Sequence, residues 1–258
     1  MRIALVTGAG SGIGRASVIA LARDGFSVVV AGRQAAPLEE TAERCRQAGA
    51  EALAVPVDVT DPMSVDVLYA TIGDRFGRLD LLFNNAGRGA PPASVGDLPI
   101  EVWREVVDTN LTGAFLMAQL AARSMAAAGG GAIVHNASID ASGGDGPFAA
   151  YNASKAALLG LSRTMALELA EHGIRSNCVS PGFTHTDMTE KAVGPELMSY
   201  LNGQFARVPM KRLVRTDEVA NAILFLASDD ASAITGTNLT VDCGLTANWF
   251  ILETLPEG

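Results

Sequence analysis

Residues 3–14 read IALVTGAGSGIG, an apolar run that leads directly into a loop with four glycines at alternate positions. The run 3–6 has the character of a short buried strand, and residues 12–23 place apolar side chains at helical spacing. Glycines between a strand and a helix permit a tight turn and a close approach of the backbone to a ligand. The N-terminus of the helix favours an anion. We therefore expect a strand–loop–helix unit that cradles a phosphate-bearing ligand.

Outward from this unit, strand-like and helix-like segments alternate to the end of the chain. The further predicted strands are residues 27–31, 52–57, 79–83, 132–136, 174–179 and 238–241. The further predicted helices are residues 37–48, 62–76, 101–125 (as one or two helices), 149–171 and 216–226. Apolar strands between helices are typical of a parallel sheet covered on both faces. The sequence predicts an α/β fold, a doubly wound, mainly parallel, seven-stranded sheet of Rossmann type.

The chain shows no break in composition and no internal repeat, so we expect a single domain over residues 1–258. Ligands of such sheets bind at the carboxyl ends of the strands. Residues from about 183 to 215 form the main irregular excursion and follow a strand end. We expect this segment to be a lid over a substrate.

Charge and cysteine content exclude several classes of protein. The net charge of −9 disfavours binding to nucleic acid or to an anionic membrane. The three cysteines are scattered without a CxxC pair, which argues against disulfides and against a metal site and fits a reducing compartment. No signal peptide or apolar stretch long enough to span a bilayer is present. We expect a cytoplasmic protein that acts on a small molecule.

The motifs point to a known family. Residues 7–14, TGAGSGIG, fit TGxxxGIG rather than GxGxxG, because Ile13 occupies the place of the third glycine, and residues 151–155 fit YxxxK. On these motifs the chain resembles the single-domain branch of the short-chain dehydrogenase/reductase family, over nearly its whole length except after Phe183 and in the last dozen residues. The resemblance implies an oxidoreductase that transfers a hydride between NAD(P) and a ketone or secondary alcohol.

Tyr151 and Lys155 are four residues apart on a predicted helix, which places both side chains on one face. A free tyrosine has a pKa near 10, and a nearby ammonium together with an oxidised nicotinamide would lower that pKa. The resemblance implies that Tyr151 is the general acid/base and that Ser138 holds the substrate oxygen. It also implies that Asn110 holds a water beside the lysine in a proton relay.

The resemblance further implies a set of cofactor-binding residues. These are Thr7, Gly8, Ser11, Gly12, Ile13, Gly14, Arg33, Asp58, Val59, Asn85, Ala86, Gly87, Tyr151, Lys155, Pro181, Gly182, Thr184 and Thr186. Gly32 stands where NAD-dependent relatives often have aspartate, and the following Arg33 can pair with the 2′-phosphate of NADP. NADP is therefore the preferred cofactor. NAD remains the alternative, because Ser11 stands where NADP-dependent relatives often carry a basic residue.

The substrate is less constrained by sequence. We expect an apolar pocket lining from Phe148, Met188, Leu197, Met198 and Tyr200, whereas Asp140 and Asp145 either contact a polar substrate or begin turns. Two departures from the family pattern, His135 in place of asparagine and Cys243 in place of glycine, are not expected to affect the chemistry.

Alternatives to hydride transfer are a lyase or isomerase of the same family and a non-catalytic NAD(P)-binding regulatory protein. The longer relatives with lyase or isomerase chemistry usually carry an added domain, and the regulatory members typically lose the tyrosine or the lysine. We expect no added domain in this chain, and it keeps both residues. The resemblance implies a homo-oligomer, a tetramer or dimer, and the apolar residues 249–252 are candidates for a subunit contact.

Overall fold

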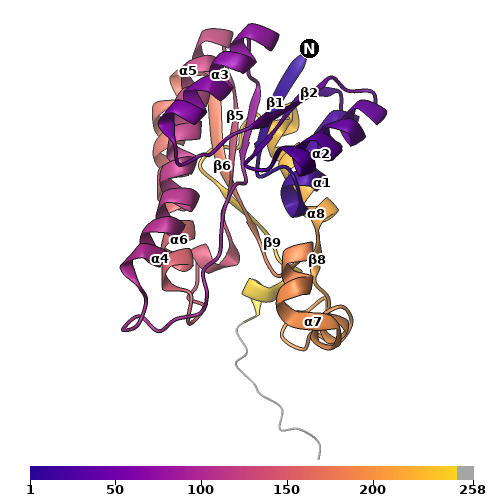
Figure 1. Cartoon of the computed structure of the whole chain (residues 1–258), viewed down its shortest axis with the longest axis vertical. Helices are drawn as coiled ribbons and strands as arrows, with labels where there is room; N and C mark the ends of the chain where they lie inside the picture. Colours follow the sequence, from indigo (N-terminus) through magenta and orange to yellow (C-terminus); the bar gives the residue numbers. More distant parts are fainter. Residues whose placement is uncertain (249–258) are drawn as a thin grey trace, which may run out of the picture.

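The computed structural model describes residues 1–248, apart from the side chains of residues 187, 188 and 192. The apolar residues 249–252 and the side chain of Met188 therefore lie outside the described residues. Figure 1 shows one central sheet with helices packed on both of its faces. The α/β fold that the sequence predicts is confirmed.

The sheet contains seven strands in the order β3-β2-β1-β4-β5-β6-β9, and every neighbouring pair is parallel. The strands are β1 Arg2–Thr7, β2 Phe26–Gly32, β3 Ala52–Pro56, β4 Leu81–Asn84, β5 Gly131–Asn136, β6 Ile174–Pro181 and β9 Asn238–Val241. The chain moves outward from β1 to β3 and then crosses to the other side of β1 at β4. This reversal leaves a crevice at the carboxyl ends of β1 and β4, where such sheets bind ligands.

Helices cover the sheet in two layers (Figure 1). The helices are α1 Gly12–Arg23, α2 Ala35–Gln47, α3 Pro62–Phe76, α4 Ile100–Val107, α5 Gly113–Ala128, α6 Ala149–Glu168, α7 Asp187–Leu201 and α8 Thr216–Ala227. One buried core joins α1, α2 and α8 to one face of the sheet, and a second joins α3, α5 and α6 to the other. The strands read as continuous apolar runs because both of their faces are buried.

The structure refines the predicted helix over residues 101–125. It consists of α4 and α5 joined through a π-helical turn, Asp108–Thr112, that contains Asn110. Such turns are frequent at functional sites. The predicted helix over residues 149–171 ends earlier, at Glu168, and a short 3₁₀ turn follows it.

The excursion over residues 183–215 contains regular structure that was not predicted. Helix α7 occupies its centre, with a kink at Gly194, and β7 (Thr184–His185) pairs with β8 (Val214–Arg215) at its two ends. Met198, Leu201 and Leu213 form a small core inside this segment, separate from the two cores of the sheet. No helix in the described part of the chain is long and apolar enough to cross a membrane.

Candidate active site

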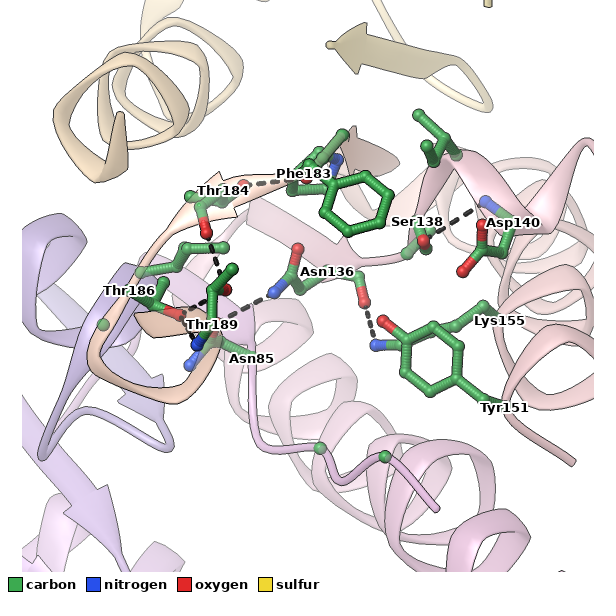
Figure 2. A pocket seen from close by; sticks show the side chains of 18 of the residues that line it. Asn85, Asn136, Ser138, Asp140, Tyr151, Lys155, Phe183, Thr184, Thr186 and Thr189 are labelled. Carbon is green, nitrogen blue, oxygen red and sulfur yellow. Dashed lines mark hydrogen bonds between the residues drawn. The ribbon is translucent and has the colours of Figure 1, made fainter. Parts of the chain in front are cut away.

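A cavity of about 440 Å³ opens at the carboxyl end of the sheet. Its walls come from the glycine loop, the ends of β4, β5 and β6, the start of α6, and the segment leading into α7. The lining residues are Gly8, Ser11, Gly12, Ile13, Asn85, Gly87, Arg88, Gly89, Asn136, Ala137, Ser138, Ile139, Asp140, Asp145, Tyr151, Lys155, Pro181, Gly182, Phe183, Thr184, Thr186 and Thr189. Figure 2 shows these side chains converging on one space.

The glycine loop has a shape that side chains would destroy. Gly8 and Gly12 have φ of 63° and 51°, in the left-handed region that favours glycine. A Cβ on Gly14 would lie 2.3 Å from the carbonyl oxygen of Gly8 and 2.5 Å from Nδ2 of Asn85. The loop therefore leaves its backbone open to the cavity at the N-terminus of α1, which fits a pyrophosphate.

The end of β4 is tied to the glycine loop by side-chain hydrogen bonds. The hydroxyl of Thr7 accepts from the backbone N–H groups of Asn85 and Ala86, at 3.0 and 2.9 Å. Nδ2 of Asn85 donates to the carbonyl of Thr7 at 2.9 Å. Thr7, Ala86 and Gly14 do not line the cavity within residues 1–248, so their part is to shape its wall.

Arg33, Asp58 and Val59 lie outside the cavity wall among the described residues, although Arg33 follows the end of β2. Arg33 is exposed and forms no ion pair within 4 Å in this part of the chain. Hydrogen bonds from the backbone and hydroxyl of Thr60 lower the pKa of Asp58, with a smaller contribution from Arg33. Val59 is buried and packs where a Cβ on Gly113 would lie, 2.7 Å from its Cγ2.

Tyr151 and Lys155 both face the cavity from the first turns of α6 (Figure 2). Nζ of Lys155 lies 5.5 Å from the centre of the Tyr151 ring and donates to the carbonyl of Asn136 at 2.6 Å. Burial lowers the pKa of Lys155 to about 8. Both groups are thus desolvated in one site, which is a common property of catalytic side chains.

Burial acts on the pKa of Tyr151 in the direction opposite to the effect expected from Lys155 and an oxidised nicotinamide. Burial raises the pKa of Tyr151 to about 12; a hydrogen bond with Ser138 acts in the opposite direction, and the charge of Asp140 raises the pKa further. Lys155, whose Nζ lies 5.5 Å from the centre of the ring, is not among the groups that lower it. Desolvation outweighs the attraction that sequence spacing suggested.

Asn110 is 1% exposed and has partners for its whole amide. Oδ1 accepts from the backbone N–H of Arg88 at 2.8 Å, and Nδ2 donates to the Arg88 carbonyl and to Oγ of Ser154, each at 3.0 Å. A Cβ on Gly87 would lie 3.3 Å from Oδ1 of Asn110 and 3.6 Å from Nζ of Lys155. Asn110 therefore lies behind Gly87, next to the lysine, and outside the cavity wall as the described residues define it.

The expected apolar lining of the substrate pocket is wrong. Met198 packs into the small core of the α7 segment, while Leu197 and Tyr200 are exposed and Phe148 does not line the cavity. Ile139 and Phe183 supply the large apolar side chains instead. A helix can turn its apolar residues into a core of its own segment, as it does at Met198, or toward a neighbouring pocket. The spacing of apolar residues in the sequence is the same in both cases, so it does not tell them apart.

Asn136, which the sequence reading did not select, lines the cavity and carries a buried acceptor. Its Nδ2 donates to Oδ1 of Asn85 at 2.9 Å, whereas its Oδ1 has no partner among the described residues. An unpaired buried acceptor is costly unless a ligand supplies a donor. This fits a cofactor with carboxamide and hydroxyl groups. The position of Asn136 at the carboxyl end of a central strand was the available signal.

His135, beside it on β5, is fully buried. Its Nδ1 lies 3.4 Å from Nδ2 of Asn84, and its Nε2 has no partner in the described part of the chain. Burial, with a smaller contribution from Lys155, lowers the pKa of His135 to about 4. The ring is therefore neutral at physiological pH.

Comparison with known proteins gives consistent matches over almost the whole chain. A family model described as Enoyl-(Acyl carrier protein) reductase matches residues 8–246. Cis-4-hydroxycyclohexanecarboxylate dehydrogenase of Sinomonas cyclohexanicum is 42% identical over 246 residues, which cover 95% of this chain and 97% of that protein.

Solved structures agree with these matches. A short-chain type dehydrogenase/reductase from Mycobacterium marinum superposes with a TM-score of 0.89 at 35% identity, covering 96% of both chains. A 7α-hydroxysteroid dehydrogenase complexed with NADH gives a TM-score of 0.88 at 34% identity, over 94% of this chain and 93% of that one. An actinorhodin polyketide ketoreductase with NADPH gives 0.89 at 35% identity, over 95% and 97%.

Proposed function

The chain belongs to the short-chain dehydrogenase/reductase family, and on this premise we propose that Tyr151 is its general acid/base. The protein is an NAD(P)-dependent oxidoreductase that acts on alcohol or ketone substrates. The observation that supports the role of Tyr151 is that Ser138, Tyr151 and Lys155 line the same cavity as the glycine loop. When bound, the nicotinamide supplies or accepts the hydride.

In the reducing direction, Tyr151 donates its proton to the carbonyl oxygen of the substrate. A phenol with a raised pKa is fully protonated at neutral pH, which suits this step. Ser138 orients the same oxygen through its hydroxyl, and Lys155 holds the ribose of the cofactor. Asn110 orders the loop at Arg88 beside the lysine. Its side-chain amide already has protein partners, so the proposed role of Asn110 in holding the water of the proton relay does not fall to that amide.

The proposal is tested with Tyr151→Phe, which removes the hydroxyl and keeps the ring. Oxidation of NADPH and NADH at 340 nm against a panel of ketones, quinones and β-ketoacyl thioesters is expected to fall by about 10²- to 10⁴-fold. Cofactor binding, followed by fluorescence, is expected to persist. Tyr69→Phe, on α3 and outside the cavity wall among the described residues, is the matched control. Equal turnover in wild type and Tyr151→Phe would refute the assignment.

The remaining cofactor-binding residues of the family pattern are part of the same proposal, with NADP as the preferred cofactor. Arg33 is an exposed cation directly after β2 without an ion pair within 4 Å among the described residues, so its charge is available to a 2′-phosphate.

Arg33→Ala is therefore expected to raise the KM for NADPH by about 10- to 100-fold, because one charge-assisted hydrogen-bonded contact is lost. The KM for NADH is expected to change little. Steady-state kinetics with both cofactors measure this, with Arg44→Ala on the exposed face of α2 as control. An equal change for both cofactors would show that Arg33 does not bind the 2′-phosphate, and it would remove this support for NADP.

We also propose that the protein is a cytoplasmic homo-oligomer, a tetramer or dimer, and that residues 183–215 form a lid over the substrate. Large apolar side chains are exposed on the α3, α5 and α6 layer, namely Met63, Val67, Phe115 and Leu167. An exposed apolar surface of this kind supports association. Light scattering of the purified protein gives the mass that tests it.

A further inference from the structure

Two carboxylates lie on the wall of the cavity that receives the substrate. Asp140 and Asp145 are both half-buried and both line the cavity. Asp140 belongs to the short 3₁₀ turn after Ser138, and its backbone N–H donates to Oγ of Ser138 at 3.2 Å. Figure 2 shows the carboxyl group of Asp140 on the same side of the cavity as the hydroxyls of Ser138 and Tyr151.

The carboxyl group of Asp140 has no salt bridge within 4 Å in the described part of the chain. Among the described residues that line the cavity, Arg88 is the one arginine, and it pairs with Glu105 at 2.7 Å. Burial and the nearby charge of Asp145 raise the pKa of Asp140, against the smaller opposing effects of a hydrogen bond with Ser138 and the charge of Lys155, so the group is desolvated beside a second acid. A carboxyl group in this state gains from a ligand that donates a hydrogen bond to it.

The carboxyl groups of Asp140 and Asp145 restrict the chemical groups that a substrate can place beside them. An anionic group next to Asp140 and Asp145 is repelled, and a purely apolar substrate leaves the carboxyl group of Asp140 with its hydrogen bond to Ser138 but no partner for its remaining acceptor positions. An ammonium group is attracted by the acids but is repelled by Lys155, which lines the same cavity. A neutral hydroxyl satisfies the carboxylate without this repulsion.

We propose that Asp140 determines specificity by accepting a hydrogen bond from a second hydroxyl of the substrate, which makes vicinal diols, and α-hydroxyketones in the reverse direction, the substrate class. The inference rests on the proposed function, because Ser138 and Tyr151 must hold the reacting oxygen. Because both the backbone N–H and the carboxyl group of Asp140 lie at hydrogen-bonding distance from the hydroxyl of Ser138, we assign its partner to the carbon next to the reacting one.

The reaction balances without a further reactant. In oxidation, the reacting carbon loses a hydride to the oxidised nicotinamide, and its hydroxyl gives its proton to Tyr151, which must first have lost its own proton to solvent to act as a phenolate base. One carbon–oxygen single bond becomes a carbonyl, and the second hydroxyl keeps its proton and stays bound to Asp140.

The test uses cyclohexanols that differ only at the second carbon: cyclohexanol, cyclohexane-1,2-diol, 2-aminocyclohexanol and 2-hydroxycyclohexanecarboxylate. The wild type is expected to oxidise the diol with a kcat/KM at least about tenfold above that of cyclohexanol, the effect of one hydrogen bond to a charged group. Asp140→Leu is expected to remove this preference, and Asp140→Asn to reduce it. Asp74→Asn, on the exposed face of α3, is the control.

The readout is a ratio of substrates within one protein, so a partly unfolded variant does not imitate the result. Cofactor binding by fluorescence shows that each variant is folded. A preference for the diol that is unchanged in Asp140→Leu overturns the inference, as does a preference for the amine, the carboxylate or cyclohexanol itself. If the diol is not oxidised while ketones of the wider panel are reduced, the inference fails and the proposed function stands. If no substrate reacts in either direction, the proposed function fails.

Discussion

At the scale of single residues, burial controls the protonation of the side chains around the cavity. It raises the pKa of Tyr151 to about 12 and lowers that of Lys155 to about 8 and that of His135 to about 4. In each case the first cause is the loss of water around the charged form. The spacing of four residues predicts that Tyr151 and Lys155 lie on one helix face, but it does not predict how far the fold buries them and removes their water.

The buried His135 predicts how stability depends on pH. The unfolded chain binds a proton at this residue as the pH falls below about 6.5, whereas the folded chain does so only near pH 4. Stability is therefore complete above pH 6.5 and falls by about 1.4 kcal/mol per pH unit in the window between the two values. Between pH 6.5 and 5 the wild type should lose about 2 kcal/mol that His135→Asn keeps.

Urea unfolding at these two pH values measures the difference. His172→Asn, at an exposed position after α6, serves as the control and should behave as the wild type does. Parallel losses in wild type and His135→Asn would show that the ring is charged or hydrated in the folded protein.

At the scale of elements, the glycine loop and the helix after it are one unit. Gly14 lies in the first turn of α1, where its missing Cβ leaves room for the carbonyl of Gly8 and the amide of Asn85. Gly73 lies in α3 with nothing within 4 Å of the position of a Cβ. The packing of the loop therefore requires glycine at position 14, whereas the surroundings of Gly73 leave room for a side chain.

Gly14→Ala should displace the loop, because a Cβ at 2.3 Å from a backbone oxygen has no space. We expect a loss of at least about 1–3 kcal/mol in the free energy of unfolding and a loss of cofactor binding. Gly73→Ala should leave binding unchanged and raise stability by up to about 1 kcal/mol, through helix propensity. Urea unfolding and fluorescence titration of NADPH compare the two. Retained binding in Gly14→Ala would mean that the loop does not hold the cofactor.

At the scale of the whole molecule, the α7 segment (residues 183–215) packs on a core that is separate from the two cores of the sheet. Figure 1 shows α7 at one end of the molecule, beside β8 and away from the two helical layers. It packs on its own small core, and it reaches the cavity through Thr184, Thr186 and Thr189. A segment with few contacts to the main cores opens more readily than they do.

If this segment closes over the site, a bound cofactor should slow its motion. We expect hydrogen–deuterium exchange in residues 184–201 to slow when NADPH is added, whereas exchange in α3, on the far layer, stays the same. Tyr151→Phe should show the same protection, because it keeps the cofactor site. Protection confined to the glycine loop would mean that residues 183–215 are not a lid.

The sequence by itself determined the parallel α/β sheet, the glycine loop and the pairing of Tyr151 with Lys155, because periodicity and glycine requirements act over a few residues. Only the tertiary structure decided the polar character of the cavity. Asn136 and Asp140 come from the end of β5 and the turn after it, and the fold brings them beside the glycine loop and the end of β4, which lie far away in the chain, whereas Met198 turns into the core of its own segment. Burial and unpaired polar atoms arise from such long-range contacts, and no local pattern encodes them.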